Sequence, residues 1–119
     1  TYGRPDSLAC AVRSAQLQNF GDWRLLVIGD SCGQETADAM APLLRDPRIR
    51  YVNLPFRCGE QALPNSAAMA LAQSEFIAFL NHDDLWLPDH LETALRVLRD
   101  SRAHLFLGRS ASTHRARAY

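Results

Sequence analysis

Short runs rich in apolar residues alternate with amphipathic segments along nearly the whole chain, and this order restricts the folds open to it. Such runs, bounded by turn residues, are typical of strands covered on both faces. They predict strands at residues 23–30, 49–54, 75–80 and 104–108. Helical periodicity predicts helices at residues 5–20, 35–46, 65–73 and 87–100. This alternation favours an α/β fold in which a mainly parallel, Rossmann-like sheet is sandwiched by helices.

Individual residues refine this prediction. Pro5 suits the first turn of a helix, and Asp6 beside it interacts favourably with the helix dipole. Pro42 lies inside the predicted helix 35–46 and should kink it or split it in two. The first helix needs a strand from which to cross over, so we also expect a strand before Thr1 that this truncated sequence lacks.

Composition limits the number of domains and the kinds of partner that the chain can have. A chain of 119 residues that is 47% hydrophobic is large enough to bury its own core. We therefore expect residues 1–119 to form a single domain, with 109–119 as a frayed tail. The 13 basic and 13 acidic residues balance, which argues against nucleic acid as a partner. No apolar run reaches membrane-spanning length, so membrane association is expected only through segments outside this sequence.

The cysteines indicate a reducing environment. Cys10, Cys32 and Cys58 are odd in number and irregularly spaced, which predicts free thiols and a cytoplasmic location. Cys10 and Cys58 are expected to be buried or half-buried hydrophobic side chains. Cys32 lies in a polar loop, but no accompanying His or Asn pattern favours nucleophilic catalysis.

Acidic residues follow two of the predicted strands. Asp30 ends the strand at 23–30, and the sequence NHDD, residues 81–84, follows the strand at 75–80. The carboxyl ends of parallel strands share one rim of a sheet, so these acids should lie together. Two carboxylates repel by up to about 4 kcal/mol at about 4 Å with an effective dielectric near 20, so they need a cation or donors. Oxygen ligands alone suit Mg²⁺ or Mn²⁺, which would bridge the protein to a diphosphate.

The residues by themselves leave other interpretations open. Asp30 could cap the helix that follows it, and Asp83 and Asp84 could form an ordinary solvated turn. Trp86 is expected to pack under the cleft, with stacking on a sugar or base as the alternative. The histidines are expected at the surface, without a role as metal ligands: His82, His90, His104 and His114.

Six motifs in order resemble a known family. They are TYGRP, QNFGDW, RLLVIGDSCGQET, DPRIRYV, RCGEQALPN and SEFIAFLNHDDLWLPDHLE. Each motif is weak alone, but together, at plausible spacing, they resemble the nucleotide-binding half of the inverting family 2 glycosyltransferases, which have the GT-A fold. The resemblance runs from Thr1 to about Gly108.

The resemblance implies a nucleotide-sugar donor, with UDP as the expected nucleotide, and Mn²⁺ or Mg²⁺ as the cofactor. Asp30 would receive the nucleobase, while Thr1 and Tyr2 would cradle the base and ribose. Residues 81–84 occupy the place of the family's DXD metal motif. The expected donor-binding residues are Thr1, Tyr2, Arg4, Asp30, Asn65 and Asp83, and the expected metal ligands are Asp83 and Asp84.

Three positions depart from the family pattern. Gly29 replaces the first acid of the pair that ends in Asp30, and Asn81 replaces the leading acid of the metal motif. Pro64 stands where an arginine often precedes the asparagine matched by Asn65. These changes predict weaker metal binding and the loss of one bidentate phosphate partner, which Arg57 could replace.

The resemblance also implies that the acceptor and the general base belong to a further half of the enzyme. The sequence after Gly108, RSASTHRARAY, contains no carboxylate. We therefore expect this chain alone to bind donor without transferring sugar to an acceptor of unknown identity. A noncatalytic interaction module is the alternative. A phosphotransfer or dehalogenase-like enzyme is disfavoured, because the expected aspartyl nucleophile is absent.

Overall fold

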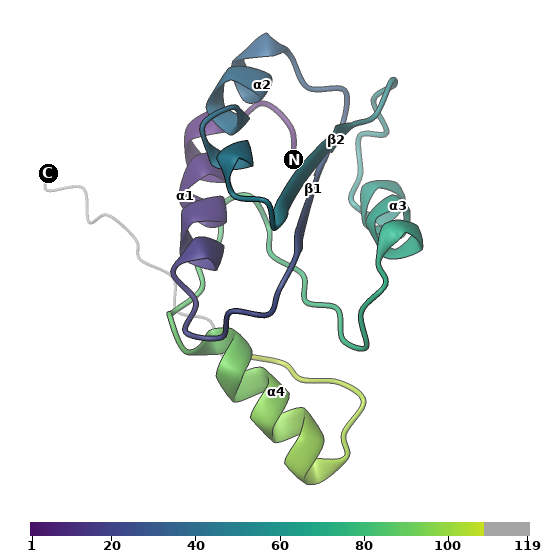
Figure 1. Ribbon diagram of the computed structural model, residues 1–119. Helices are drawn as coiled ribbons and strands as arrows, with labels where there is room; N and C mark the ends of the chain where they lie inside the picture. The colour runs from purple at the N-terminus through teal and green to yellow at the C-terminus, as the bar shows by residue number, and fades with distance from the viewer. Residues whose placement is uncertain (109–119) are drawn as a thin grey trace, which may run out of the picture.

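The computed structural model describes residues 1–108, and a small parallel sheet lies at its centre (Figure 1). Strands β1 (Leu25–Gly29) and β2 (Ile49–Asn53) pair along their whole length. The helices are α1 (Pro5–Gln16), α2 (Gln34–Met40), the 3₁₀ helix η1 (Leu43–Arg45), α3 (Ala62–Leu71) and α4 (His90–Ser101). The predicted α/β class with parallel strands is confirmed. The predicted tail, 109–119, lies outside the described residues.

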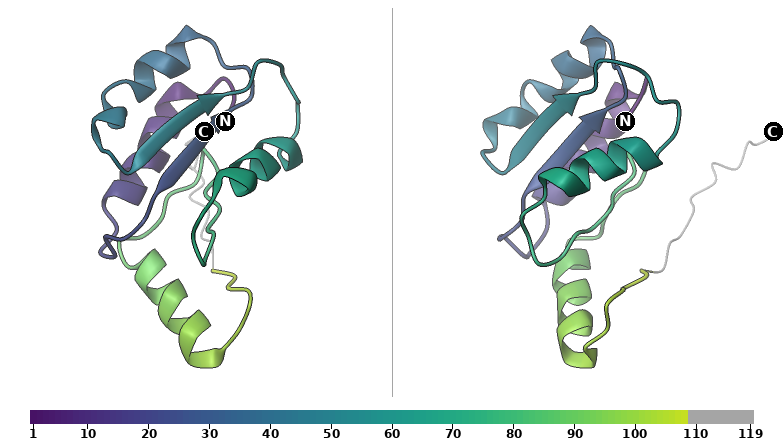
Figure 2. Two further views of the ribbon diagram at one scale, coloured as in Figure 1. Left: turned by 45° about the vertical axis from the view of Figure 1, so that its right-hand side comes forward. Right: turned by 90° about the vertical axis from the view of Figure 1, so that its right-hand side faces the viewer.

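Helices cover both faces of the sheet. Helices α1 and α2 lie on one face and α3 lies on the other, as two further views show (Figure 2). The core fills the space between the sheet, α1 and α2, where Met40 is fully buried. Burying one such side chain contributes roughly 1.5–3 kcal/mol. The residues that form this cluster are Leu8, Val12, Val27, Met40, Leu43 and Ile49.

Both predictions made from the positions of prolines are confirmed. Helix α1 begins at Pro5. The predicted helix 35–46 splits at Pro42 into α2 and η1. The first helix is shorter than predicted, however, because it ends at Gln16. Beyond it, the Asn19 amide donates to the Pro88 carbonyl at 2.8 Å, so this backbone is bound to another segment of the chain.

Two of the four predicted strands do not form. Residues 75–80 and 104–108 have no ladder partner among residues 1–108, so these two predictions were wrong. An apolar run becomes a strand only where a neighbouring backbone can complete its hydrogen bonds. Segment 75–80 lies near β1 without pairing with it, and Phe106 instead contacts the His90 ring edge-on, with centroids 6.1 Å apart.

One polar side chain on α1 and one just after it bind the segment that leads into α4. The Trp86 amide donates to Ser14 Oγ at 3.1 Å. Gln18 Nε2 donates to the Leu87 carbonyl at 2.6 Å, and Gln18 Oε1 accepts from the Leu91 amide at 2.9 Å. Ser14 and Gln18 are both buried. Beyond this anchor α4 extends away from the sheet and buries none of its residues (Figure 1).

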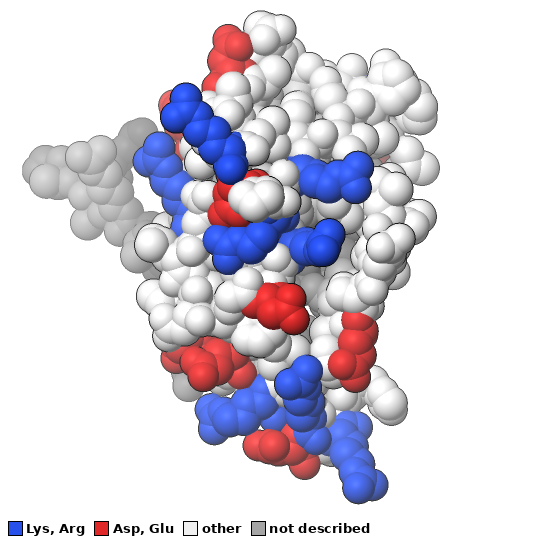
Figure 3. Space-filling view, in the orientation of Figure 1, with Lys and Arg blue, Asp and Glu red and all other residues white. Residues whose placement is uncertain are grey.

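Basic and acidic residues balance in the sequence, with 13 of each. On the face shown in Figure 3, arginines and acids are interspersed without a large patch of one sign. Such a distribution provides no long-range field for steering a polyanion. Among residues 1–108, no helix has the length and apolar character needed to cross a bilayer.

Candidate nucleotide-sugar site

The N-terminal segment lies beside the tip of β1 and connects the predicted site residues. The Thr1 amino group donates to the Ile28 carbonyl at 2.6 Å, and the Asp30 amide donates to the Thr1 carbonyl at 2.9 Å. Three residues farther along, Arg4 Nη1 contacts Asp83 Oδ2 at 3.2 Å. Asp30 and Asp83 thus both contact the N-terminal segment, Asp30 through its backbone amide and Asp83 through its side chain.

Asp30 is held by the loop that follows β2. Its side chain is buried, with 6% of the residue exposed. Oδ1 accepts from the Cys58 amide at 2.5 Å and Oδ2 accepts from the Gly59 amide at 2.9 Å. These bonds, from Cys58 first and Gly59 second, hold the pKa of Asp30 below its ordinary value. A carboxylate has about four lone-pair sites, so acceptor capacity remains for a ligand.

The alternative role of Asp30 as a helix cap was wrong. Helix α2 is capped by Gly33, with no side-chain cap hydrogen bond. The contact with Cys58 and Gly59 was missed from the sequence. Gly59 was the one sequence feature that could have indicated this contact. The φ of Gly59 is +75°, which suits glycine and turns the loop so that the Gly59 amide can face Asp30.

Asn53, at the end of β2, fixes the loop after β1 and was also missed. Its Oδ1 accepts from the Cys32 amide at 2.8 Å, and its Nδ2 donates to the Cys32 carbonyl at 2.9 Å. Cys32 Sγ in turn donates to the Thr1 carbonyl at 3.2 Å. The loop after β1, the end of β2 and the N-terminal segment are therefore bound into one unit.

The packing around position 29 explains why a glycine stands there, where the family pattern has the first acid of a pair. A Cβ at Gly29 would lie 2.5 Å from Asn53 Oδ1 and 2.7 Å from the Tyr51 hydroxyl. A carboxylate there would displace both side chains. Tyr51 is itself partly buried, and this burial, with contributions from Cys32, raises its pKa to about 12.

Tyr2 and Arg57 form a pair at the exposed edge of the site. The Arg57 guanidinium lies 4.0 Å from the centroid of the Tyr2 ring, a cation–π geometry. Tyr2 is 43% exposed. Arg57 also lowers the pKa of Asp30 slightly through its charge, so it is near that carboxylate. The arrangement places a cationic and an aromatic group beside the tip of β1.

The two acids of the predicted metal motif are each paired within the protein. Asp83 contacts Arg4, and both side chains are at least half exposed. Asp84 Oδ2 accepts from Asn81 Nδ2 at 2.8 Å. The replacement of an acid by Asn81 therefore supplies a donor to Asp84 in place of a third negative charge.

The residues fit a divalent cation only in part. Within residues 1–108, no three or more His, Cys, Asp or Glu side chains gather in a geometry that could hold a metal. Mg²⁺ is commonly bound by one or two carboxylates, with waters and substrate phosphates completing its shell. Asp83 and Asp84 therefore fit a cation that arrives with a diphosphate, and do not fit a closed metal site.

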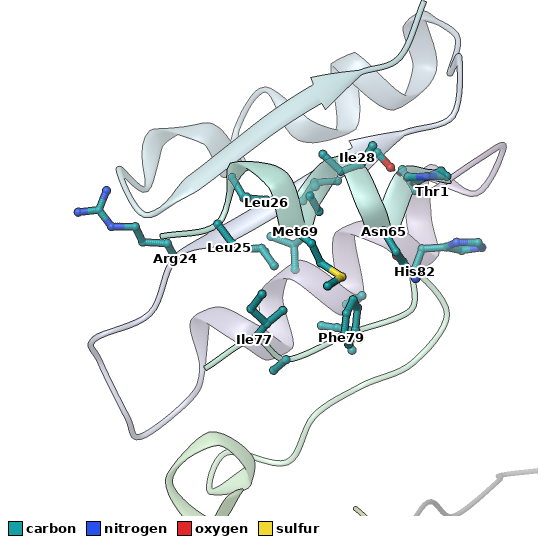
Figure 4. A pocket seen from close by; sticks show the side chains of 18 of the residues that line it. Thr1, Arg24, Leu25, Leu26, Ile28, Asn65, Met69, Ile77, Phe79 and His82 are labelled. Carbon is teal, nitrogen blue, oxygen red and sulfur yellow. Dashed lines mark hydrogen bonds between the residues drawn. The ribbon is translucent and has the colours of Figure 1, made fainter. Parts of the chain in front are cut away.

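Asn65 and His82 lie with Thr1 at one end of a groove beside β1 (Figure 4). Partial burial lowers the pKa of His82 and outweighs the opposing attraction of Asp83. Pro64 is buried in the first turn of α3. The half-buried position of His82 corrects the prediction that it is exposed.

The remaining predictions about cysteines and aromatic residues had mixed outcomes. The three cysteines are free, as predicted, but Cys10 is exposed. Trp86 stacks on His90 with ring centroids 4.8 Å apart, so His90 is half-buried and the prediction of a surface position was wrong. This pair belongs to the connection between α1 and α4.

The comparisons with known proteins agree with the motifs. Residues 1–115 match the family described as Glycosyl transferase family 2. The chain is similar to the putative colanic acid biosynthesis glycosyl transferase WcaA of Escherichia coli K12, with 32% identity over 90% of this chain and 38% of that protein. It is also similar to the GalNAc(5)-diNAcBac-PP-undecaprenol beta-1,3-glucosyltransferase of Campylobacter jejuni, with 31% identity over 89% of this chain and 35% of that protein.

A third similar protein is the succinoglycan biosynthesis protein ExoW of Rhizobium meliloti, which is 34% identical over 79% of this chain and 30% of that protein. The chain spans between 30% and 38% of the length of these relatives. The family match nevertheless covers nearly all of the chain, including every residue of the rim around β1. The chain therefore belongs to glycosyl transferase family 2.

Proposed function

We propose that this chain is the donor-binding part of an inverting glycosyltransferase that takes its sugar from a nucleoside diphosphate sugar, with UDP as the nucleotide. The observation that carries the proposal is that Asp30 and Asp83 both contact the N-terminal segment, Asp30 at Thr1 and Asp83 at Arg4. In this proposal Asp30 receives the nucleobase, and Thr1 and Tyr2 hold the base and ribose. Asn65, at the end of the neighbouring groove, is the remaining polar contact to the donor.

The electrostatics of the rim support a diphosphate ligand. Arg4 and Arg57 bring two positive charges near the acids, and arginine is well suited to bind phosphate oxygens. Arg4 contacts Asp83 in an exposed ion pair. Such a pair is worth about 0–1 kcal/mol, so a donor phosphate could replace Asp83 as the partner of Arg4 at little cost.

Asp83 and Asp84 would hold Mn²⁺ or Mg²⁺ when the donor is bound. When bound, such an ion supplies positive charge that stabilises the departing diphosphate. The residues of this chain would meanwhile orient the nucleotide. The acceptor, and the base that deprotonates its hydroxyl, are assigned to parts of the protein outside this sequence.

Titration calorimetry of the chain with UDP, in the presence and absence of MnCl₂, tests the proposal. We expect binding that is stronger with Mn²⁺ and weaker when GDP replaces UDP. Asp84→Ala should abolish the dependence on Mn²⁺, and Asp30→Asn should weaken UDP binding at every Mn²⁺ concentration. Absence of heat from the folded wild-type chain under both conditions would contradict the proposal.

Asp100→Ala is the matched control. Asp100 is an exposed carboxylate in the last turn of α4, the helix that extends away from the sheet (Figure 1). It should leave UDP binding and its response to Mn²⁺ unchanged. Circular dichroism and thermal unfolding of each variant separate a lost ligand contact from a lost fold.

A noncatalytic module is the second candidate, and one observation favours it. Both acids of the motif already have partners within the protein, Arg4 for Asp83 and Asn81 for Asp84. A site satisfied in this way has less need for a cation. If Arg4→Ala and Asn81→Ala leave the chain folded and still unresponsive to Mn²⁺ and UDP, this second candidate is preferred.

A further inference from the structure

One residue in the loop after β1 has a strained backbone. Ser31 has a φ of +57°, and among residues 1–108 the other non-glycine residue with a positive φ is Arg102, at +53°. Arg102 is the C-cap of α4, where a left-handed residue is common. Ser31 instead lies between the end of β1 and the start of α2. A residue with a Cβ disfavours this conformation, so surrounding contacts must hold Ser31 in it.

The two neighbours of Ser31 are each bound to another segment. On one side, the Asp30 amide donates to the Thr1 carbonyl at 2.9 Å. On the other side, Asn53 Oδ1 accepts from the Cys32 amide at 2.8 Å, and Asn53 Nδ2 donates to the Cys32 carbonyl at 2.9 Å. Ser31 is therefore held between two fixed points of the backbone. The second point depends on a side chain, so a single substitution can release it.

The contact from Asn53 also closes a ring of the chain around the site. Asn53 ends β2. The segment that follows returns to β1, where the Cys58 and Gly59 amides bind the Asp30 carboxylate. Both ends of this segment are thus bound to the loop after β1, one at Cys32 and the other at Asp30. A shift at one end of the ring should therefore be felt at the other.

Asparagine is the side chain that suits this contact. Its carboxamide carries an acceptor and a donor side by side, which match the Cys32 amide and carbonyl. An aspartate would instead place a second acceptor against the Cys32 carbonyl. Asn53 is exposed, and a hydrogen bond there contributes only modestly to stability. The contact therefore matters more for the conformation of the loop than for the stability of the fold.

We propose that Asn53 is a positioning residue, which acts on the nucleobase site through Cys32 and Ser31. By holding Cys32, Asn53 keeps Ser31 in the left-handed conformation. This conformation keeps the Asp30 carboxylate directed at its two amide donors, with its remaining lone pairs available to a base. The inference rests on the proposed role of Asp30 in donor binding.

Amide hydrogen exchange tests this geometry without a ligand. Asn53→Ala removes both bonds to Cys32 and, because Asn53 is exposed, opens no cavity in the core. We expect exchange of the Cys58 and Gly59 amides to accelerate by on the order of fivefold. These amides are bound to Asp30 and not to Asn53, so the effect reports the orientation of the Asp30 carboxylate.

Two controls accompany this measurement. The Val12 amide lies inside α1, and its exchange should be the same in Asn53→Ala as in the wild-type chain. Arg50→Ala truncates another exposed side chain of β2. It should leave exchange at Cys58 and Gly59 as in the wild-type chain. Circular dichroism establishes that each variant is folded.

A second substitution, at Ser31, separates positioning from a merely structural contact. Glycine has no Cβ and adopts the left-handed conformation without strain. Ser31→Gly added to Asn53→Ala should therefore return exchange at Gly59 to within about twofold of the wild-type rate. Ser31→Ala added to Asn53→Ala removes the hydroxyl but keeps the Cβ, so it should restore nothing.

Titration calorimetry with UDP and MnCl₂ tests the effect on the donor. Only a fraction of the Asn53→Ala chains should hold the loop in its binding conformation, so UDP binding should weaken by on the order of fivefold. Adding Ser31→Gly should recover the affinity. In an Asp30→Asn background, Asn53→Ala should weaken UDP binding by less than about twofold, because the group that Asn53 positions is already lost.

The outcomes separate this inference from the donor proposal. Unchanged exchange at Cys58 and Gly59 in folded Asn53→Ala would overturn the inference, whether or not the chain binds UDP. Faster exchange with unchanged UDP affinity would show that the contact is structural only. Equal rescue by Ser31→Gly and Ser31→Ala would exclude the left-handed conformation as the link. Absence of UDP binding by the wild-type chain would contradict the donor proposal, and the exchange rates would still decide whether Asn53 orients Asp30.

Discussion

Residues 1–53 and 54–108 have similar apolar patterns but differ in how well they are packed. Every buried hydrophobic residue of the core cluster lies between residues 8 and 49. In the second region only Pro64 is buried, while large apolar side chains such as Phe79 and Leu105 are exposed. The difference shows that an apolar pattern indicates which side chains need other apolar groups to pack against. It does not indicate whether the fold supplies those groups.

Helices α1 and α4 show the same contrast. Both have twelve residues and an amphipathic pattern. Helix α1 buries a complete stripe against α2 and the sheet, whereas α4 buries no residue. The first turn of α4 is bound by Gln18, whose Oε1 accepts from the Leu91 amide, so a polar contact anchors the start of this helix.

Truncation of one methionine in each region should give the largest contrast. Met40 is fully buried, so Met40→Ala should lower the free energy of unfolding by about 2–5 kcal/mol. Met69 is 51% exposed, and Met69→Ala should change it by less than about 1 kcal/mol. Urea unfolding followed by circular dichroism measures both. Equal losses would mean that the second region is as tightly packed as the first.

Glycine substitutions should give the next largest effect. Gly29→Ala places a methyl group against Asn53 and Tyr51, and we expect a loss of about 1–3 kcal/mol in unfolding free energy. Gly21→Ala is the control, because its Cβ would meet no atom within 4 Å and should have an effect within about 0.5 kcal/mol. A tolerated alanine at Gly29 would show that Asn53 does not rigidly hold the loop.

Asp30 connects the two regions through the amides of Cys58 and Gly59, and its contribution should depend on pH. Its folded pKa is lowered. The stabilisation is therefore fully present above the unfolded pKa of about 3.9 and is lost as the pH falls through the lower folded value. Asp30→Asn should thus lower the urea midpoint at pH 7 and have a smaller effect at pH 3. A difference independent of pH would contradict this role.

The ion pair between Arg4 and Asp83 is a second link and should have the smallest effect. Both side chains are at least half exposed, so Arg4→Ala should cost about 0–1 kcal/mol of unfolding free energy, and less at high salt. Arg13→Ala, in the last turn of α1, is the control. Thermal unfolding at low and high NaCl measures the difference. A large loss that persists in high salt would show that Arg4 packs as well as pairs.

Much of the local structure was predictable because it depends on neighbours in sequence. Pro5 begins α1 and Pro42 ends α2 for reasons of φ and a missing amide hydrogen, which no tertiary contact needs to supply. The parallel pairing of the strands around residues 27 and 51 followed from the alternation of elements. The acids at 30 and 83 were likewise found from their positions after apolar runs, although their roles in donor binding stay predictions.

The hydrogen bonds of the site were not predictable, because they join residues far apart in the chain. Asn53 binds the Cys32 loop across 21 positions, and Asp30 binds Gly59 across 29. Nothing in the local pattern distinguishes these side chains from ordinary loop residues.

The sequence alone determined where the chain can be helical, which runs must be covered by other elements, and to which family the chain belongs. The first two properties arise from backbone preferences and from the spacing of apolar side chains, and the family is indicated by the six motifs in order. Only the tertiary structure decided which apolar runs became strands and which carboxylates accept which amides. A strand or a buried carboxylate is stable only when a second, distant segment supplies its hydrogen-bond partners, and that segment is positioned by the fold as a whole.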